Sequence, residues 1–391
     1  MVAMSRPRAT SGWRCFATTA PGLEPFLAEE LAGLGLSGVK PGASGVAFRG
    51  DRTALMRVCL TSRVAHRVLW TLGDVDATSR ESLYKGVRAA ARWEGLIPPD
   101  KTLAVFASVR DAPAFHDTRM AGLTVKDAIV DAVRDARGAR PSVSVDDPDV
   151  VVRLAVKGAR GVLSLDGAGR QSLHARGYRT EAGEAPLRET IAAAMIVASG
   201  WDARTPLIDP LCGSGTLLIE AALYAKRVAP GLLREAHGFA RWTGHRQDLL
   251  LRLTSDLKRA TTRRCPPILG RDSDPAMLTL ARANTERAGL PSAVTLERGD
   301  ARAMKNPFPD APPGVIVANP PYGHRLSDAR AASELLNELG AVMRAEFRGW
   351  TGCFILPRDN VVRALGLPII RRWPTRNGAL EVEIVTVAVP R

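Results

Sequence analysis

The stretch LIDPLCGSGTLLIEAALYAKRV, residues 207–228, places an apolar strand, a glycine-containing loop and an apolar helix in direct succession. Gly213 and Gly215 let the loop backbone approach a ligand closely, and a helix that begins at Thr216 offers unpaired N–H groups at its start. The loop lacks the G-x-G-x-x-G form of a dinucleotide site and the Gly-Lys-Ser/Thr ending of a phosphate-binding P-loop. By itself the unit is also compatible with an ordinary strand-to-helix turn.

The residues around this stretch repeat the same alternation. A helix over 187–200 precedes it, and the apolar runs at 267–272, 293–300, 314–319 and 351–357 are separated by helical patterns at 275–289 and 330–347. Strands that alternate with helices require parallel crossovers. We therefore predict a doubly wound, mostly parallel seven-stranded sheet, closed by an antiparallel hairpin that turns at Arg376–Asn377–Gly378.

Acidic residues end the next two predicted strands. Asp272 stands at the carboxyl edge of the sheet beside the glycine loop, where a carboxylate can accept both hydroxyls of a ribose. Asp274 precedes Pro275, and this pair is typical of a helix start, so we assign Asp274 a capping role. Asp300 ends the following strand and can accept a hydrogen bond from an adenine amino group. The order of these residues favours a site for S-adenosylmethionine, as in class I methyltransferases.

The tetrapeptide NPPY at 319–322 follows the apolar run VIVA and gives the sharpest chemical signal. The side-chain oxygen of Asn319 and the carbonyl of Pro320 can both accept hydrogen bonds from one planar NH₂ group. Pro320 and Pro321 make the turn rigid, and Tyr322 offers a ring on which a flipped base can stack. These four residues are the predicted catalytic set, and they suit adenine, guanine or a glutamine amide equally well.

The front half of the chain has no phosphate-binding glycine loop. We predict a strand, a helix and a strand over 13–50, a long helix over 52–70, helices near 79–96 and 124–138, and strands at 101–109, 148–158 and 161–169. Residues 170–186 lack hydrophobic periodicity, which is typical of a linker. The front half therefore fits a binding module.

The composition of the chain limits the kinds of partner that it can bind. The chain has 391 residues and a formal net charge of +14, which favours a polyanion, although a basic proteome would produce the same excess. No stretch is long and apolar enough to span a bilayer and no signal peptide is apparent, so we expect a cytoplasmic protein. Five scattered cysteines without a C-x-x-C pair indicate neither a metal site nor a disulfide framework.

The motifs GLEPFLAEEL, SGVAFRGD, VKDAIVDAVRD, SLHARGYR and APLRETIAAA resemble the bacterial 23S rRNA guanine 2-amino methyltransferases. This resemblance covers nearly the whole chain. It implies a ferredoxin-like part (1–43), a THUMP RNA-binding domain (44–156), a connector (157–186) and a Rossmann-like class I methyltransferase domain (187–391). The terminal hairpin RNGALEVEI departs locally from the family pattern. Some relatives carry a second, 7-methylguanine-forming methyltransferase, which we expect to be absent because this chain ends at Arg391.

The resemblance also implies a site. The cofactor, S-adenosylmethionine, would be held by residues on the loops at the strand ends: Thr190, Asp209, Pro210, Cys212, Gly213, Ser214, Gly215, Thr216, Asp272, Ser273, Asp300, Ala301 and Asn319. The partner would be structured RNA, most simply 23S rRNA or a large-subunit assembly intermediate. Neither a metal nor a membrane is implied.

Basic residues outside the site are candidate RNA contacts. They group at the end of the 124–138 helix, in the connector and in an Arg-rich insertion: Arg134, Arg137, Arg140, Arg176, Arg179, Lys258, Arg259, Arg263 and Arg264. Each could equally be a solvated surface charge. Three other functions stay open, namely a THUMP-type tRNA guanine methyltransferase, an adenine-amino methyltransferase and a non-catalytic RNA-binding assembly factor.

Overall fold

Two β-sheets organise the chain in the computed structural model, which describes residues 12–179, 187–321, 326–358 and 361–391. The front half forms an eight-stranded sheet in the order β2-β3-β1-β4-β8-β7-β5-β6. Its strands are β1 (Trp13–Thr18), β2 (Ser37–Gly42), β3 (Gly45–Gly50), β4 (Arg67–Asp76), β5 (Thr102–Arg110), β6 (Ser142–Val143), β7 (Val150–Lys157) and β8 (Arg160–Asp166).

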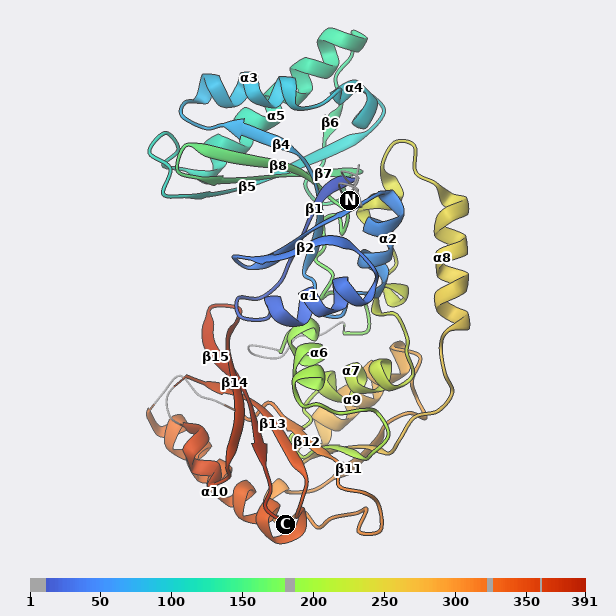
Figure 1. The fold of residues 1–391 in the computed structure, drawn as a ribbon, viewed down its shortest axis with the longest axis vertical. Coiled ribbons are helices and arrows are strands. Elements are labelled where there is room, and N and C mark those ends of the chain that lie inside the picture. Colours follow the sequence, from blue (N-terminus) through green and yellow to red (C-terminus); the bar gives the residue numbers. More distant parts are fainter. Residues whose placement is uncertain (1–11, 180–186, 322–325, 359–360) are drawn as a thin grey trace, which may run out of the picture.

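Strand β4 joins the two parts of this sheet. It pairs antiparallel with β1 on one side and with β8 on the other. Residues before and after β4 therefore share one continuous sheet, and Figure 1 shows the sheet bending between them.

The predicted helix over 52–70 is wrong in its second half. Helix α2 (Arg52–Thr61) begins at its N-cap Asp51 and ends before Ser62, and β4 then starts at Arg67. The apolar residues Val64, Ala65 and Val68 continue the helical spacing, which is why the pattern misleads. Pairing with two neighbouring strands decides the conformation instead, because it satisfies the backbone groups of β4 on both edges.

Helices cover one face of each part of the front-half sheet. Helix α5 buries Val125, Ile129 and Val133 at helical spacing and ends at Gly138, whose φ is +73°. Figure 1 shows α3 and α5 side by side over β4 and β8, with α1 and α2 nearer the second half of the chain. The helices are α1 (Glu24–Gly33), α2, α3 (Arg80–Ala90), α4 (Trp93–Leu96) and α5 (Thr118–Arg137).

The second sheet has seven strands in the order β11-β10-β9-β12-β13-β15-β14. All neighbours from β11 to β13 are parallel, while β15 is antiparallel to both β13 and β14. The predicted mostly parallel sheet with an antiparallel terminal hairpin is confirmed. The strands are β9 (Leu207–Asp209), β10 (Ile268–Asp272), β11 (Thr295–Arg298), β12 (Val315–Ala318), β13 (Thr351–Pro357), β14 (Ile369–Asn377) and β15 (Leu380–Ala388).

Central strand β12 is buried on both faces, as expected for a parallel strand between two helix layers. Ile316 belongs to the apolar cluster on the α10 side, whereas Val315 and Val317 belong to the cluster on the α6 and α7 side. The α-helices are α6 (Glu189–Ala198), α7 (Thr216–Ala225), α8 (Gln247–Arg259), α9 (Pro275–Arg287) and α10 (Leu326–Glu346). Short 3₁₀ helices are η1 (Pro230–Leu233), η2 (Gly238–Arg241), η3 (Ala301–Ala303) and η4 (Val361–Leu365).

The two halves touch through polar and close backbone contacts. Arg63, between α2 and β4, donates to the carbonyls of Leu223 and Val228 in the second half, at 3.2 and 2.9 Å. Gly231 in η1 lies against Leu60, where an added Cβ would come within 2.6 Å of the Leu60 Cα. Within the described part of the chain, no helix is long and apolar enough to cross a membrane.

Candidate active site

Four side chains at the carboxyl ends of adjacent strands define the candidate site. In spatial order they are Asp300 after β11, Asp272 at the end of β10, Asp209 at the end of β9 and Asn319 after β12. In the register of the sheet, Asp209 pairs with Gly270 and Arg298 pairs with Asp272. The sheet therefore gathers these residues at one edge, where ligands of open α/β sheets bind.

The glycine loop and Asp272 are joined directly. The Gly213 N–H donates to Asp272 Oδ2 at 2.9 Å, and the Cys212 N–H donates to the carbonyl of Arg271 at 2.8 Å. Gly213 and Gly215 have φ values of +50° and +83°. A Cβ on Gly213 would meet no described atom within 4 Å, so this backbone borders open space that a ligand can occupy.

Asp209 is buried beneath the same loop. Its Oδ1 accepts the Leu211 N–H at 3.1 Å. Burial raises the pKa of Asp209 to about 8, and the neighbouring Asp272 carboxylate acts in the same direction. Asp209 therefore carries a proton over much of the neutral range when no ligand is present.

Two of the predicted site residues have a buried side-chain oxygen with no hydrogen-bond partner in the described part of the chain. The two oxygens are Thr190 Oγ1 at the start of α6, and Asn319 Oδ1 after β12. Leaving a buried acceptor unpaired costs free energy, so such atoms call for a ligand or water. Pro320 is buried and Pro321 is exposed, while the predicted Tyr322 lies outside the described residues.

The remaining predicted cofactor residues occupy the same loops. Asp300 is exposed and accepts from the Arg302 guanidinium at 2.7 Å, which lowers its pKa, while Ala301 is buried beside it. Ser273 is exposed after β10. The predicted capping role of Asp274 is confirmed, because its Oδ1 accepts the Ala276 N–H at 2.8 Å at the start of α9.

Two predicted RNA contacts have little exposed surface. Arg176 is 1% exposed, with its guanidinium bonded to the carbonyls of Arg63 and Leu173 and paired with Glu220. Arg179 pairs with Glu189 at 3.0 Å, and its side chain is only 10% exposed. Both arginines therefore have protein partners that replace solvent and leave little surface for phosphate. The other seven basic candidates are exposed.

Sequence reasoning missed two buried polar residues behind the loop. Glu220, on the first turns of α7, accepts from Tyr178 and Arg176. Asn284 on α9 donates from Nδ2 to the Ser214 carbonyl at 2.9 Å. The sequence signal that could have found them is a polar residue at an inward-facing position of an otherwise apolar helix. That signal does not identify their hydrogen-bond partners, which are far away in sequence.

The donor set fits S-adenosylmethionine better than a metal. A carboxylate beside a glycine loop, a neutralised buried acid and unpaired oxygens at Thr190 and Asn319 match an amino acid, a ribose and a base. Among the residues that the structure describes, no group of three or more His, Cys, Asp or Glu side chains could hold a metal ion. This geometry, on a seven-stranded sheet with a reversed last strand, defines a class I methyltransferase.

Family comparisons agree with that class. Residues 176–385 match the family described as RMKL-like, methyltransferase domain. Residues 14–69 match an RlmL ferredoxin-like domain, and residues 77–166 match a THUMP domain. The chain therefore belongs to the RMKL-like methyltransferase-domain family, and the predicted fold class and resemblance are confirmed.

Two curated relatives are similar to this chain over most of its length. The chain is 41% identical to "Ribosomal RNA large subunit methyltransferase K/L" of Methylococcus capsulatus over 94% of its own length, and 40% identical to the protein of the same name from Magnetococcus marinus over 91%. It spans about half the length of these relatives, 50% of each.

Solved structures are similar over nearly the whole chain. A protein described as a predicted N6-adenine-specific DNA methylase from Listeria monocytogenes is 28% identical, with a TM-score of 0.86, and the match covers 97% of each chain. The protein SMU.472, solved in complex with SAH, is also 28% identical, with a TM-score of 0.88, and the match covers 98% of this chain and 100% of that one.

Proposed function

We propose that this chain transfers a methyl group from S-adenosylmethionine to the exocyclic 2-amino group of a guanine in 23S rRNA. The observation that carries the proposal is the row of strand ends, in which Asp300, Asp272 and Asp209 lead to Asn319. Three of these residues suit the cofactor, and the fourth presents an unpaired acceptor for an amino group. The predicted cytoplasmic location belongs to the same proposal.

S-adenosylmethionine is the cofactor that the family and the SAH complex of SMU.472 imply. When bound, it supplies an electrophilic methyl group on a sulfonium. The chain's own contribution is to hold it, with the glycine loop from Asp209 to Thr216 beneath it and Asp272 available to the ribose hydroxyls. Asp272 retains acceptor capacity for this role, because each carboxylate oxygen accepts more than one hydrogen bond.

Asn319 and Pro320 would orient the target amine. Asn319 Oδ1 and the Pro320 carbonyl each accept one N–H, so both amine hydrogens are engaged and the nitrogen lone pair is drawn out of conjugation with the base. The two prolines restrict the turn, so little reorganisation is required at the moment of transfer. Positioning of this kind matters more than a strong base, because the methyl donor is already activated.

Three observations support RNA as the molecule that contains the target base. They are the THUMP match at 77–166, the formal charge of +14 and the names of the curated relatives. Guanine and its 2-amino group come from the family resemblance. Large-subunit rRNA or an assembling particle is the partner that we propose.

The test is to incubate the purified chain with methyl-labelled S-adenosylmethionine and total RNA from cells that lack the protein. We expect label in 23S rRNA as 2-methylguanosine after nucleoside digestion. Label in tRNA would favour the tRNA enzyme, and label in 6-methyladenine would favour the adenine enzyme. Cofactor binding without label in any RNA, either free or in large-subunit assembly particles from the same cells, would contradict the proposal and favour a non-catalytic assembly factor.

A further inference from the structure

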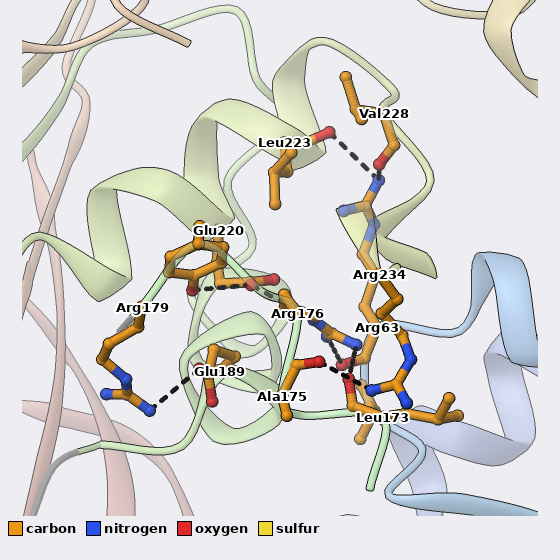
Figure 2. A network of polar contacts seen from close by, with 12 residues as sticks. Arg63, Leu173, Ala175, Arg176, Arg179, Glu189, Glu220, Leu223, Val228 and Arg234 are labelled. Atoms are coloured by element: carbon orange, nitrogen blue, oxygen red, sulfur yellow. Dashed lines mark hydrogen bonds and ion pairs between the residues drawn. The ribbon is translucent and has the colours of Figure 1, made fainter. Parts of the chain in front are cut away.

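The connector contacts the catalytic half through a buried polar network. Figure 2 shows Arg176 between the front half and Glu220 of α7, with its Nη2 donating to the Arg63 carbonyl at 2.6 Å. The Tyr178 hydroxyl donates to Glu220 Oε1 at 3.1 Å. Arg234 adds bonds to the connector carbonyls of Ser172 and Ala175, both at 2.7 Å. The connector is thereby fastened beside the helix that follows the glycine loop.

A second branch of this network reaches the glycine loop itself. Arg287 on α9 donates from Nε to the Tyr178 carbonyl at 2.8 Å and from Nη2 to Asn284 Oδ1 at 2.5 Å. Asn284 then donates from Nδ2 to the Ser214 carbonyl at 2.9 Å. An unbroken chain of hydrogen bonds thus runs from the connector to the residue between the two loop glycines.

The orientation of the Asn284 amide follows from its partners. A guanidinium can only donate, so the Asn284 oxygen must face Arg287. The amide nitrogen must then face Ser214, whose carbonyl can only accept. Asn284 is 3% exposed, so water cannot readily replace either contact. An aspartate there would keep the Arg287 contact and lose the donor to the loop.

The loop requires such a tether. Gly213 and Gly215 both have positive φ values and no side chain to restrict them, so the conformation of the loop depends on external hydrogen bonds. Helix α9 also packs closely beneath the loop, since a Cβ on Gly215 would lie 3.2 Å from the Ala281 Cβ. Asn284 is three residues further along the same helix.

We infer that Asn284 is a positioning residue for the cofactor loop, and that Arg287 orients Asn284 and ties the loop to the connector. This role rests on the proposed function, because the loop is proposed to hold S-adenosylmethionine. Neither residue is assigned any contact with the cofactor. Both residues restrict the loop to fewer conformations in the free protein, so less conformational entropy is lost when the cofactor binds.

The test compares cofactor affinity in the full chain by calorimetry, with S-adenosylmethionine and S-adenosylhomocysteine, which lacks the sulfonium charge, as probes. We expect Asn284→Asp and Asn284→Ala to weaken both probes about tenfold, because the Ser214 carbonyl loses its buried donor. We expect Arg287→Met to weaken both by a smaller factor. The matched control is Thr285→Val, which removes a hydrogen bond of similar burial, from Thr285 Oγ1 to the Ala281 carbonyl at 2.7 Å, within α9 itself and not to a loop carbonyl.

Equal weakening by Thr285→Val and Asn284→Asp would overturn the role, because the effect would then be general destabilisation of α9. Unchanged affinity in both Asn284 variants would also overturn it. A change in Asn284→Asp that affects S-adenosylmethionine alone would overturn it too, since the introduced charge would then be the cause. A native chain that binds neither probe would instead refute the proposed function.

Discussion

At the scale of single residues, the site separates into groups that hold the cofactor and groups that hold the target. Asp272 bonds the glycine loop, whereas Asn319 Oδ1 is buried without a partner among the described residues. A polar side chain that is already hydrogen-bonded to the cofactor loop contributes to cofactor binding, whereas a pre-oriented side chain without a partner is available to the substrate. Substitution should therefore affect different kinetic constants at the two positions.

Asn319→Ala should lower turnover by about 100-fold or more, because one of two acceptors for the amine is removed. Cofactor affinity should stay within about twofold of the native value, which calorimetry would check. Asn306→Ala is the control, because Asn306 Oδ1 only accepts the Phe308 N–H in a local turn. Substantial activity in Asn319→Ala would rule out its role in positioning the amine.

Asp272→Ala should weaken cofactor binding by about tenfold or more, because it removes the ribose acceptor and the 2.9 Å bond from the Gly213 N–H. Asp274→Ala makes a matched control two residues away. It removes the α9 cap and should lower the free energy of unfolding by about 1 kcal/mol, with an unchanged cofactor dissociation constant. Equal dissociation constants for Asp272→Ala and the native chain would exclude the ribose assignment.

Asp209 should make stability depend on pH. Its pKa is raised to about 8 in the folded chain, so its stabilising contribution is complete below the unfolded pKa near 4 and is lost as pH rises through about 8. Asp209→Asn should remove this loss, which is at most about 1.4 kcal/mol per pH unit. Urea unfolding between pH 6 and pH 9 would measure the difference.

The control for this pH effect is Asp300→Asn. Asp300 is exposed, and the Arg302 guanidinium lowers its pKa, so its titration is complete below this range. The Asp300→Asn variant should keep the native slope between pH 6 and pH 9. An Asp209→Asn variant that also keeps the native slope would contradict the buried protonated acid.

At the scale of elements, α7 links the glycine loop to the connector. It begins at Thr216 with the loop and carries Glu220 one turn later, buried against Arg176 and Tyr178. A buried ion pair costs desolvation energy and contributes little net stability, but removal of one partner leaves a charge uncompensated. Removal of either partner should therefore lower the stability of the chain, and the two losses should be coupled.

Arg176→Met and Glu220→Gln should each lower the free energy of unfolding by about 3–5 kcal/mol, because each leaves a buried partner unpaired. The double variant should lose less than the sum of the two, with a coupling of about 0.5–3 kcal/mol. Urea unfolding of all three variants would test this. Lys85→Met, at an exposed pair with Glu81, should change nothing measurable, and strict additivity would argue against direct coupling.

At the scale of the whole molecule, the basic candidates are widely spread. Figure 1 shows α5 at the end of the molecule away from the C-terminus, and α8 along the flank opposite α10. The exposed set at the end of α8 is Lys258, Arg259, Arg263 and Arg264. An RNA that touches both α5 and α8 would have to extend along much of the molecule.

Replacement of these four side chains by glutamine should weaken RNA binding across sequences. The slope of log K against log salt should fall by about 0.7–0.9 for each phosphate that the variant no longer neutralises. Filter binding at several salt concentrations would measure the slope. Lys305 and Arg348 are exposed charges on the α10 side, outside the predicted set, and their replacement should leave the slope unchanged. Equal slopes for the native and quadruple variants would remove α8 from the RNA interface.

Local signals were strong enough to determine the catalytic half from sequence. Alternating apolar strands and helices, Asp-Pro at a helix start and Asn-Gly at a turn are properties of neighbouring residues, so the order of strand ends and the α9 cap could be predicted. The same signals failed at 62–70, where helical spacing continues into a strand. There the pairing of β4 with β1 and β8 overrides the local pattern.

Only the tertiary structure decided which polar residues face solvent. Arg176 and Arg179 lie in a connector whose sequence suggests RNA binding, yet Arg176 is paired with Glu220 and Arg179 with Glu189, and each also donates to a backbone carbonyl. Asn284 looks like an ordinary helix residue until α9 brings it under Ser214. Sequence determines the order of chemical groups along the chain and along the sheet edge. Whether a charge is buried depends on contacts between residues that are far apart in sequence, and no local pattern encodes those contacts.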